Sequence, residues 1–176
     1  MKLKQPVLRG HPLHAMLSDF PIALIPTALL AAALDRAGVG GARPAADAAA
    51  RLAAASAAAA VLVGWWDWLL IPGSHPAKRP ATIHGLLNSS VLAASIFAAF
   101  DRPRRLWALG TVIGALGIAA WLGGDLVYAH GWRVRPAEEL EIMDEQLRRE
   151  GRSDLHEDAR RQVDDYERRE TFLPAD

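Results

Sequence analysis

The chain has 176 residues, of which 51% are hydrophobic, and its 20 basic and 20 acidic side chains cancel in formal charge. Averaged over the whole chain, the mean hydropathy of +0.07 would suit a soluble domain. The absence of cysteine excludes disulfides, thiolate metal sites and cysteine-ligated iron–sulfur clusters within this chain.

Charge divides the chain into two parts near residue 136. Residues 1–136 carry 13 Lys and Arg against six Asp, whereas residues 137–176 carry seven Arg against 14 Asp and Glu. The first part therefore has a net charge of +7 and the second a net charge of −7. This contrast predicts a basic, alanine-rich membrane domain over residues 1–136 and an acidic soluble tail over residues 137–176.

Four apolar segments lie within the first part, and each is long enough to cross a membrane. In chain order they cover residues 17–34, 52–71, 83–100 and 106–128. A helix needs about 20 residues to span a hydrocarbon core of about 30 Å. The connections 35–51, 72–80 and 101–105 are polar and contain Gly or Pro, as expected where water must satisfy the backbone. The sequence therefore predicts an all-α fold, an integral membrane four-helix bundle.

Small residues predict that the helices pack closely. An alanine run over residues 53–60 gives the second segment a thin side, and Gly110 and Gly114 form a G-x-x-x-G pair on the fourth segment. Small side chains let helix backbones approach each other in a membrane. We therefore expect both features to lie inside the bundle.

The remaining residues, 137–176, are predicted to form a short, charged, helical C-terminal tail. Leu140, Met143 and Leu147 recur at helical spacing, and Ser153 is expected to cap a second helix. His156 lies within this tail and is expected to be solvated.

Five of the six histidines lie where an apolar segment begins or ends. Because an up-and-down path brings alternate helix ends to one side of the membrane, all five are expected at the same face. Three aspartates just inside the segments join them there, and an ionisable group in a membrane is costly enough to mark a functional site. The residues of this predicted polar end are His11, His14, His75, His84, His130, Asp19, Asp67 and Asp125.

His14 and His84 are the preferred ligand pair at the polar end. The first and third segments start on the same side, so they run parallel and their imidazoles are expected to face each other. His84 and Asn88 share one helix face, because they are four residues apart. Two axial histidines inside an apolar helical bundle are typical of haem b, with His11 and His130 as further candidate ligands. His75, in a Pro-rich loop, is expected to be solvated.

Two other chemistries fit the same residues. One is a small site of nitrogen and oxygen donors, in which His14 and His84 join carboxylates to hold zinc, copper or non-haem iron. Its candidate carboxylates are Asp19, Asp67 and Asp125. The other is a proton relay or hydrogen-bonded network without a metal. In a metal or haem site, Asp67 and Asp125 are also expected to orient a ligating imidazole as hydrogen-bond acceptors.

Four motifs stand out along the chain. They are G-H-P-L-H-A-M-L-S-D-F-P-I-A-L at 10–24, G-W-W-D-W at 64–68, H-G-L-L-N at 84–88 and L-G-G-D-L-V-Y-A-H-G at 122–131. Over roughly residues 8–135 the chain resembles the domain of unknown function 2231 family of predicted membrane proteins. The positions that match the family pattern are His11, His14, Asp67, His84, Asn88, Gly123, Gly124, Tyr128, His130 and Gly131.

This resemblance implies a four-helix membrane domain. Some relatives are joined to Rieske-type iron–sulfur or cytochrome-like modules, which implies a redox role, although this chain has no such module. The chain has Asp19 where relatives often carry His, and Asp125 where they often carry Glu. An interchange of His and carboxylate suits a metal or proton site, and it disfavours Asp19 as a haem ligand.

The residues and the resemblance together predict a redox-linked membrane protein, an electron-transfer membrane subunit that binds haem or another metal through histidines at one membrane face. The alternative is a non-redox transporter-like or assembly subunit, whose His and Asp side chains serve proton transfer or helix packing. We expect a multi-pass protein in the lipid bilayer of a bacterial-type inner membrane, with cytoplasmic termini. The expected partners are a redox protein or a second copy of the chain, and no nucleic acid.

Overall fold

The computed structural model describes residues 5–9, 11–132, 135–152, 154–155, 157–159 and 161–162. The chain divides into two compact units, Met1–His130 and Gly131–Asp176.

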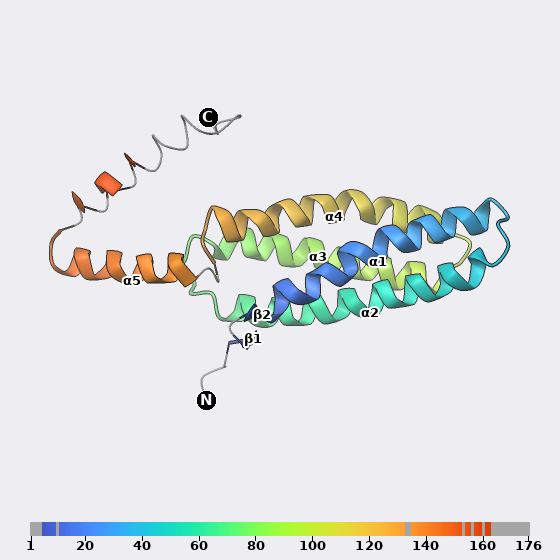
Figure 1. Ribbon diagram of the computed structural model, residues 1–176, viewed down its shortest axis with the longest axis horizontal. Coiled ribbons are helices and arrows are strands. Elements are labelled where there is room, and N and C mark those ends of the chain that lie inside the picture. The colour runs from blue at the N-terminus through green and yellow to red at the C-terminus, as the bar shows by residue number, and fades with distance from the viewer. Residues whose placement is uncertain are drawn as a thin grey trace. The chain divides into compact units, whose positions relative to one another are not determined.

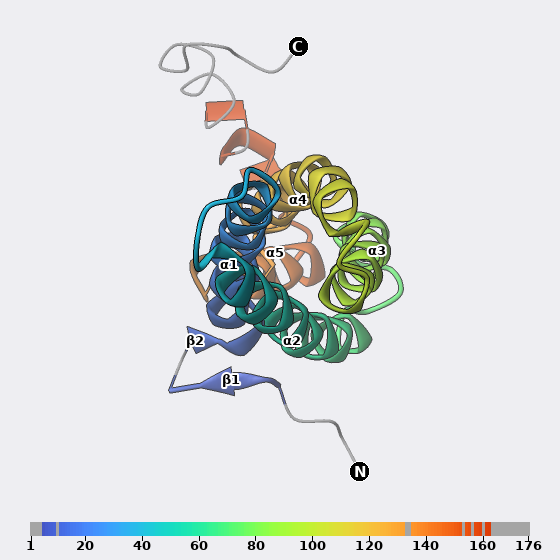
Figure 2. The same cartoon turned by 90° about the vertical axis from the view of Figure 1, so that its right-hand side faces the viewer.

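Four long helices make up the first unit. They are α1 (Leu13–Arg36), α2 (Ala42–Leu69), α3 (Lys78–Phe100) and α4 (Arg105–Tyr128). The helices run up and down in chain order, so α1 and α3 start at the same end of the bundle (Figure 1). Both α1 and α3 pack against α2 and α4, which puts α1 and α3 at opposite corners (Figure 2). The predicted four-helix bundle is confirmed.

The outer surface of this bundle is apolar, as a lipid bilayer requires. All four helices are long and apolar enough to cross a membrane. Large hydrophobic side chains point outward, and Leu62, Trp107 and Trp121 are 71%, 80% and 70% exposed. A soluble protein rarely exposes apolar surface on this scale. The chain is therefore an integral membrane protein with four spans.

Alanine forms the inner face of α2. Ala46, Ala50, Ala53 and Ala57 are buried and recur every three or four residues, which keeps them on one side of the helix. Ala46, Ala50 and Ala53 pack in a core with Ile25 of α1, whose side chain is fully buried. The predicted thin side of the second segment is confirmed, and it lets α1 and α2 lie close together.

The glycine pair on α4 does not pack inside the bundle, so that prediction is wrong. A Cβ built on Gly110 or Gly114 would meet no atom of the described chain within 4 Å. Both glycines are exposed, whereas Leu109 and Val112 on the other side of the helix are buried. Rotation of α4 about its axis therefore turns the G-x-x-x-G pair outward, which spacing alone could not determine.

The first connection is shorter than predicted, because α2 begins at Ala42 rather than at residue 52. The intervening residues are rich in alanine, the strongest helix former, and this preference extends the helix into the polar stretch. Gly38 and Gly41 have φ angles of +78° and +77°, in the left-handed region that favours glycine. They turn the chain between α1 and α2.

Two short strands, which the sequence analysis does not predict, precede α1. The strand β1 (Val7–Leu8) pairs antiparallel with β2 (His11–Pro12), and Val7 lies opposite Pro12. Strands of two residues are too short to show the alternation of apolar and polar residues by which strands are recognised.

A buried arginine joins three helices at the end of the bundle opposite the polar end. Arg105 of α4 is 4% exposed and donates from Nη1 to Oδ1 of Asp47 in α2 at 2.8 Å. Its Nε donates to the Ala98 carbonyl oxygen of α3 at 2.8 Å. Arg102 also pairs with Asp47, and this hydrogen bond raises the pKa of Arg102 above its ordinary value. In the sequence, Asp47, Arg102 and Arg105 lie in predicted polar connections, and only the folded chain brings Asp47 to Arg105.

The second unit contains α5 (Arg135–Arg149), which confirms the first predicted tail helix. Ion pairs at helical spacing join Asp144 to Arg148 at 2.6 Å and Glu145 to Arg149 at 3.0 Å. The described residues between 154 and 162 are also helical, as predicted. Ser153 and His156, named in the sequence analysis, lie outside the described residues.

Four spans return the chain to the side on which it starts, which leads to a topology prediction. We expect reporter fusions at residue 40 and after residue 176 to report opposite compartments. A fusion at residue 74, between α2 and α3, should match the fusion after residue 176, because both follow an even number of spans. The measurement is reporter activity in cells, and matching signals at residues 40 and 176 would contradict the topology.

Candidate functional site

The structure brings His14 and His84 together between the helices, near the polar end of the bundle. His14 lies in the first turn of α1, and His84 lies near the start of α3. Although these helices occupy opposite corners, the centroids of the two imidazole rings are 6.0 Å apart and the ring planes make an angle of 87°. The sequence-predicted pair therefore meets across the bundle, with α2 and α4 on either side.

Hydrogen bonds fix the tautomer of both rings. Nδ1 of His14 donates to the Ala60 carbonyl oxygen of α2 at 2.9 Å, and Nδ1 of His84 donates to the Ala119 carbonyl oxygen of α4 at 3.0 Å. A carbonyl oxygen only accepts hydrogen bonds, so Nδ1 must carry the proton in each ring. In the neutral imidazole, Nε2 then holds a lone pair that is available to a ligand or a donor.

Two glycines make room for these rings. A Cβ on Gly64 of α2 would lie 2.7 Å from Cε1 of His14, closer than real Cβ atoms approach. A Cβ on Gly123 of α4 would lie 3.2 Å from Cε1 of His84, which is tight. The matched motif includes Gly123, but the sequence analysis assigns no role to Gly64. The sequence signal for Gly64 is a glycine within an alanine-rich helix. Glycine there costs about 1 kcal/mol of helix stability relative to alanine, which indicates a packing or functional role.

Asn88 completes the site from the next turn of α3. Its Nδ2 donates to Nε2 of His84 at 3.1 Å and also lies 2.9 Å from the His84 carbonyl oxygen. The prediction that His84 and Asn88 share one helix face is confirmed. As a result, Nε2 of His84 already has a hydrogen-bond donor.

Tryptophans join α2 to α3 beside this site. Nε1 of Trp65 donates to Oγ of Ser89 at 3.0 Å, and its ring lies so close to Gly85 that a Cβ there would be 3.1 Å from the indole. Trp68 donates to Thr82 at 2.8 Å. These bonds join α2 to α3 at Thr82 and Ser89, which flank His84 in the sequence, so they help to set its position.

The other predicted residues are more dispersed. His11 and Asp19 are exposed, and Asp67 is buried with 8% of its surface exposed. Among the described residues, no three His, Asp or Glu side chains come close enough together to hold a metal ion. His75, predicted to be solvated, is half-buried and therefore only partly exposed, and its Nδ1 accepts a hydrogen bond from the Ala77 amide at 3.0 Å.

A second, smaller pair forms at the end of α4. Nδ1 of His130 lies 3.2 Å from the Asp125 carbonyl oxygen and 3.5 Å from its carboxylate Oδ2. Asp125 thus orients the His130 imidazole. The prediction that Asp67 or Asp125 orients a ligating imidazole is wrong for His14 and His84, because their Nδ1 partners are backbone carbonyls, which the sequence cannot reveal.

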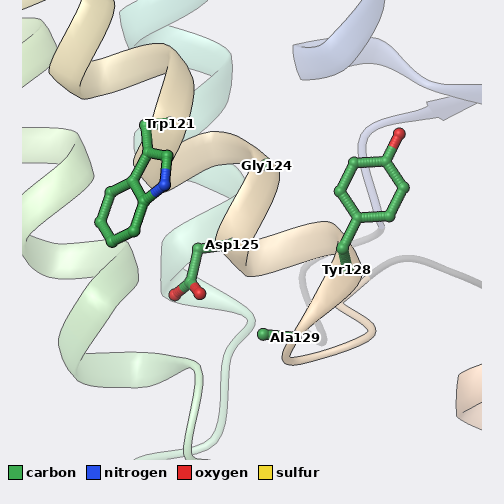
Figure 3. A pocket seen from close by; sticks show the side chains of 5 residues that line it. All are labelled: Trp121, Gly124, Asp125, Tyr128 and Ala129. Atoms are coloured by element: carbon green, nitrogen blue, oxygen red, sulfur yellow. The ribbon is translucent and has the colours of Figure 1, made fainter. Parts of the chain in front are cut away.

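Asp125 also lines an open hollow on α4. The hollow is lined by Trp121, Gly124, Asp125, Tyr128 and Ala129 (Figure 3). The indole of Trp121 and the carboxylate of Asp125 point to the same side of the helix, whereas the ring of Tyr128 points away from them (Figure 3). All five residues come from the C-terminal end of one helix, so this hollow does not enclose a ligand.

Comparison with known proteins gives one match. A family model described as a predicted membrane protein, DUF2231, matches residues 10–136. No curated protein and no solved structure shows a significant match to the chain.

Proposed function

The chain belongs to the DUF2231 family of predicted membrane proteins, and we propose that it is a redox-linked protein that binds haem b between His14 and His84. The observation that carries the proposal is the meeting of these two imidazoles at a centroid distance of 6.0 Å, each with its Nδ1 proton held by a backbone carbonyl. That arrangement leaves Nε2 as the coordinating atom of each ring.

The distance between the rings fits a shared metal. An imidazole nitrogen binds a first-row metal at about 2.0–2.1 Å and lies about 1.2 Å from its own ring centre, so two rings that share one ion have centroids about 6.4 Å apart. The observed 6.0 Å is close to this value.

The number of donors favours haem over the other metals. A haem needs only two ligands from the protein, and His14 and His84 would supply both. Zinc sites use three or four protein ligands, and non-haem iron also needs more than two. No third His, Asp or Glu joins the pair in the described chain, so zinc and non-haem iron would require Asp19, Asp67 or Asp125 to approach. Copper, the remaining alternative, is compatible with fewer ligands.

The protein's own residues set the properties of the two ligands. A hydrogen bond from Nδ1 to an acceptor makes Nε2 a better electron donor and fixes the orientation of the ring. Apolar helices surround the partly buried imidazoles, and this setting would help to tune the reduction potential of a haem held there. When bound, haem would supply reversible one-electron transfer, and the protein would act as an electron-transfer membrane subunit.

One observation favours the non-redox alternative. The Nδ1 bonds join α1 to α2 through His14 and α3 to α4 through His84, so the two rings also brace the bundle. In that case the protein would be a transporter-like or assembly subunit, and the Asp125–His130 pair would be the candidate for proton transfer.

Purification in detergent separates these functions. We expect a red preparation with about one haem per chain and a Soret band that sharpens on reduction. A colourless preparation with stoichiometric zinc, copper or iron by elemental analysis would replace haem with a site of nitrogen and oxygen donors. A preparation with neither haem nor metal would contradict the proposed function and favour the bracing role.

The surroundings follow from the same proposal. We propose a bacterial-type inner membrane as its location, with cytoplasmic termini. A redox partner protein, or a second copy of the chain, would exchange electrons with the site at the polar end.

A further inference from the structure

We propose that Asn88 acts as a latch on His84. Its side-chain amide donates a hydrogen bond to the Nε2 lone pair of His84 until a metal or haem iron displaces the amide. This inference rests on the proposed function, because it concerns the nitrogen that would coordinate the iron. It adds a residue that regulates access to the site.

The latch follows from the hydrogen-bond pattern. Because Nδ1 of His84 donates to the Ala119 carbonyl oxygen, Nε2 must be an acceptor, and it faces the Nδ2 donor of Asn88 at 3.1 Å. The same Nδ2 reaches the His84 carbonyl oxygen at 2.9 Å, which keeps the amide over the ring. A lone pair that accepts a hydrogen bond cannot bind a metal at the same time. The Asn88 amide must therefore move before His84 becomes a ligand.

The two histidines differ in this respect. In the described part of the chain, no donor hydrogen-bonds to Nε2 of His14, whose ring is tied only through Nδ1 to Ala60. Nε2 of His14 is therefore available to a metal, whereas Nε2 of His84 becomes available only when the Asn88 amide moves. A metal would bind His14 first and then compete with Asn88 for the second ligand.

The competition has a measurable size. A hydrogen bond of this kind contributes about 0.5–1.5 kcal/mol net, which corresponds to about a 2- to 10-fold change in affinity. Removing the latch should therefore tighten binding by that factor. A purely structural role for Asn88 predicts the opposite, because loss of a hydrogen bond near the site would loosen the fold and weaken binding.

The test compares Asn88→Leu with Ser90→Ala in the full-length protein. Leucine has the same branching and the same number of side-chain heavy atoms as asparagine but no hydrogen-bond donor, and Ser90 is an exposed residue of α3 that bonds only the Leu86 carbonyl within its own helix. Hemin is titrated into metal-free protein in detergent micelles and followed by its Soret band. We expect Asn88→Leu to bind hemin about 2- to 10-fold more tightly than the wild type, and Ser90→Ala to match the wild type.

A second measurement does not depend on haem. The ¹⁵N chemical shift of His84 Nε2 reports whether that nitrogen accepts a hydrogen bond, and we expect it to change in Asn88→Leu but not in Ser90→Ala. Equal or weaker hemin binding by a folded Asn88→Leu variant, or an unchanged shift, would overturn the latch. If neither the wild type nor any variant binds hemin while the shift still responds to Asn88→Leu, the proposed function fails and the hydrogen bond stands.

Discussion

Replacing either His14 or His84 with alanine is expected to remove haem almost completely, and to a similar extent in both variants. Each replacement deletes one of two axial ligands, and a six-coordinate iron needs both. Among the described residues, no third His, Asp or Glu side chain joins the pair to replace a missing ligand. The measurement is haem stoichiometry per folded chain, with helical content by circular dichroism as the check that each variant folds.

Two matched controls make this result specific. His75→Ala removes an imidazole that is bonded within the loop between α2 and α3, to the Ala77 amide, and should leave occupancy unchanged. Asp19→Asn removes the charge of an exposed carboxylate on α1 and should also have little effect. Full occupancy in both His14→Ala and His84→Ala would refute the assignment and move it to His11 and His130.

The fold and the meeting of His14 with His84 could be predicted because each rests on a strong one-dimensional signal. Runs of about 20 apolar residues identify spans with little ambiguity. A helix of that length crosses the hydrocarbon core and satisfies its own backbone hydrogen bonds there. Up-and-down connectivity then fixes which helix ends share a face, and this is enough to place His14 and His84 at one level. The same reasoning could not separate them from His11 or Asp19, which lie at the same end but are exposed.

What the sequence could not show depends on rotation and register of the helices. Gly110 and Gly114 carry the motif for close helix packing yet face outward, whereas Gly64, which no packing motif singles out, leaves the space that the His14 ring occupies. Likewise, the acceptors of both imidazoles are backbone carbonyls, which every residue has. Side-chain identity does not predict such partners. The sequence therefore favours Asp67 and Asp125 as the hydrogen-bond acceptors of the imidazoles instead.

Gly64→Ala is expected to have the second large effect, although it adds only one methyl group. The new Cβ would lie 2.7 Å from Cε1 and 2.9 Å from Nδ1 of His14, so the ring must leave its position. Moving the ring breaks its bond to the Ala60 carbonyl oxygen and carries Nε2 away from His84. Overpacking of this kind costs about 1–3 kcal/mol of stability.

Gly64→Ala should lose most of its haem while the protein still folds. Coordination requires both imidazoles at fixed positions, and it tolerates displacement less than packing does. The matched control is Gly114→Ala on the outer face of α4, where a Cβ meets no atom of the described chain within 4 Å and alanine favours the helix. Thermal unfolding in detergent and haem stoichiometry are measured on both variants. If Gly64→Ala keeps the haem content and unfolding temperature of Gly114→Ala, the His14 ring does not occupy the space beside Gly64 in the folded protein. Gly123→Ala, with its Cβ 3.2 Å from His84, should lie between the two, since a shift of a few tenths of an ångström relieves that contact.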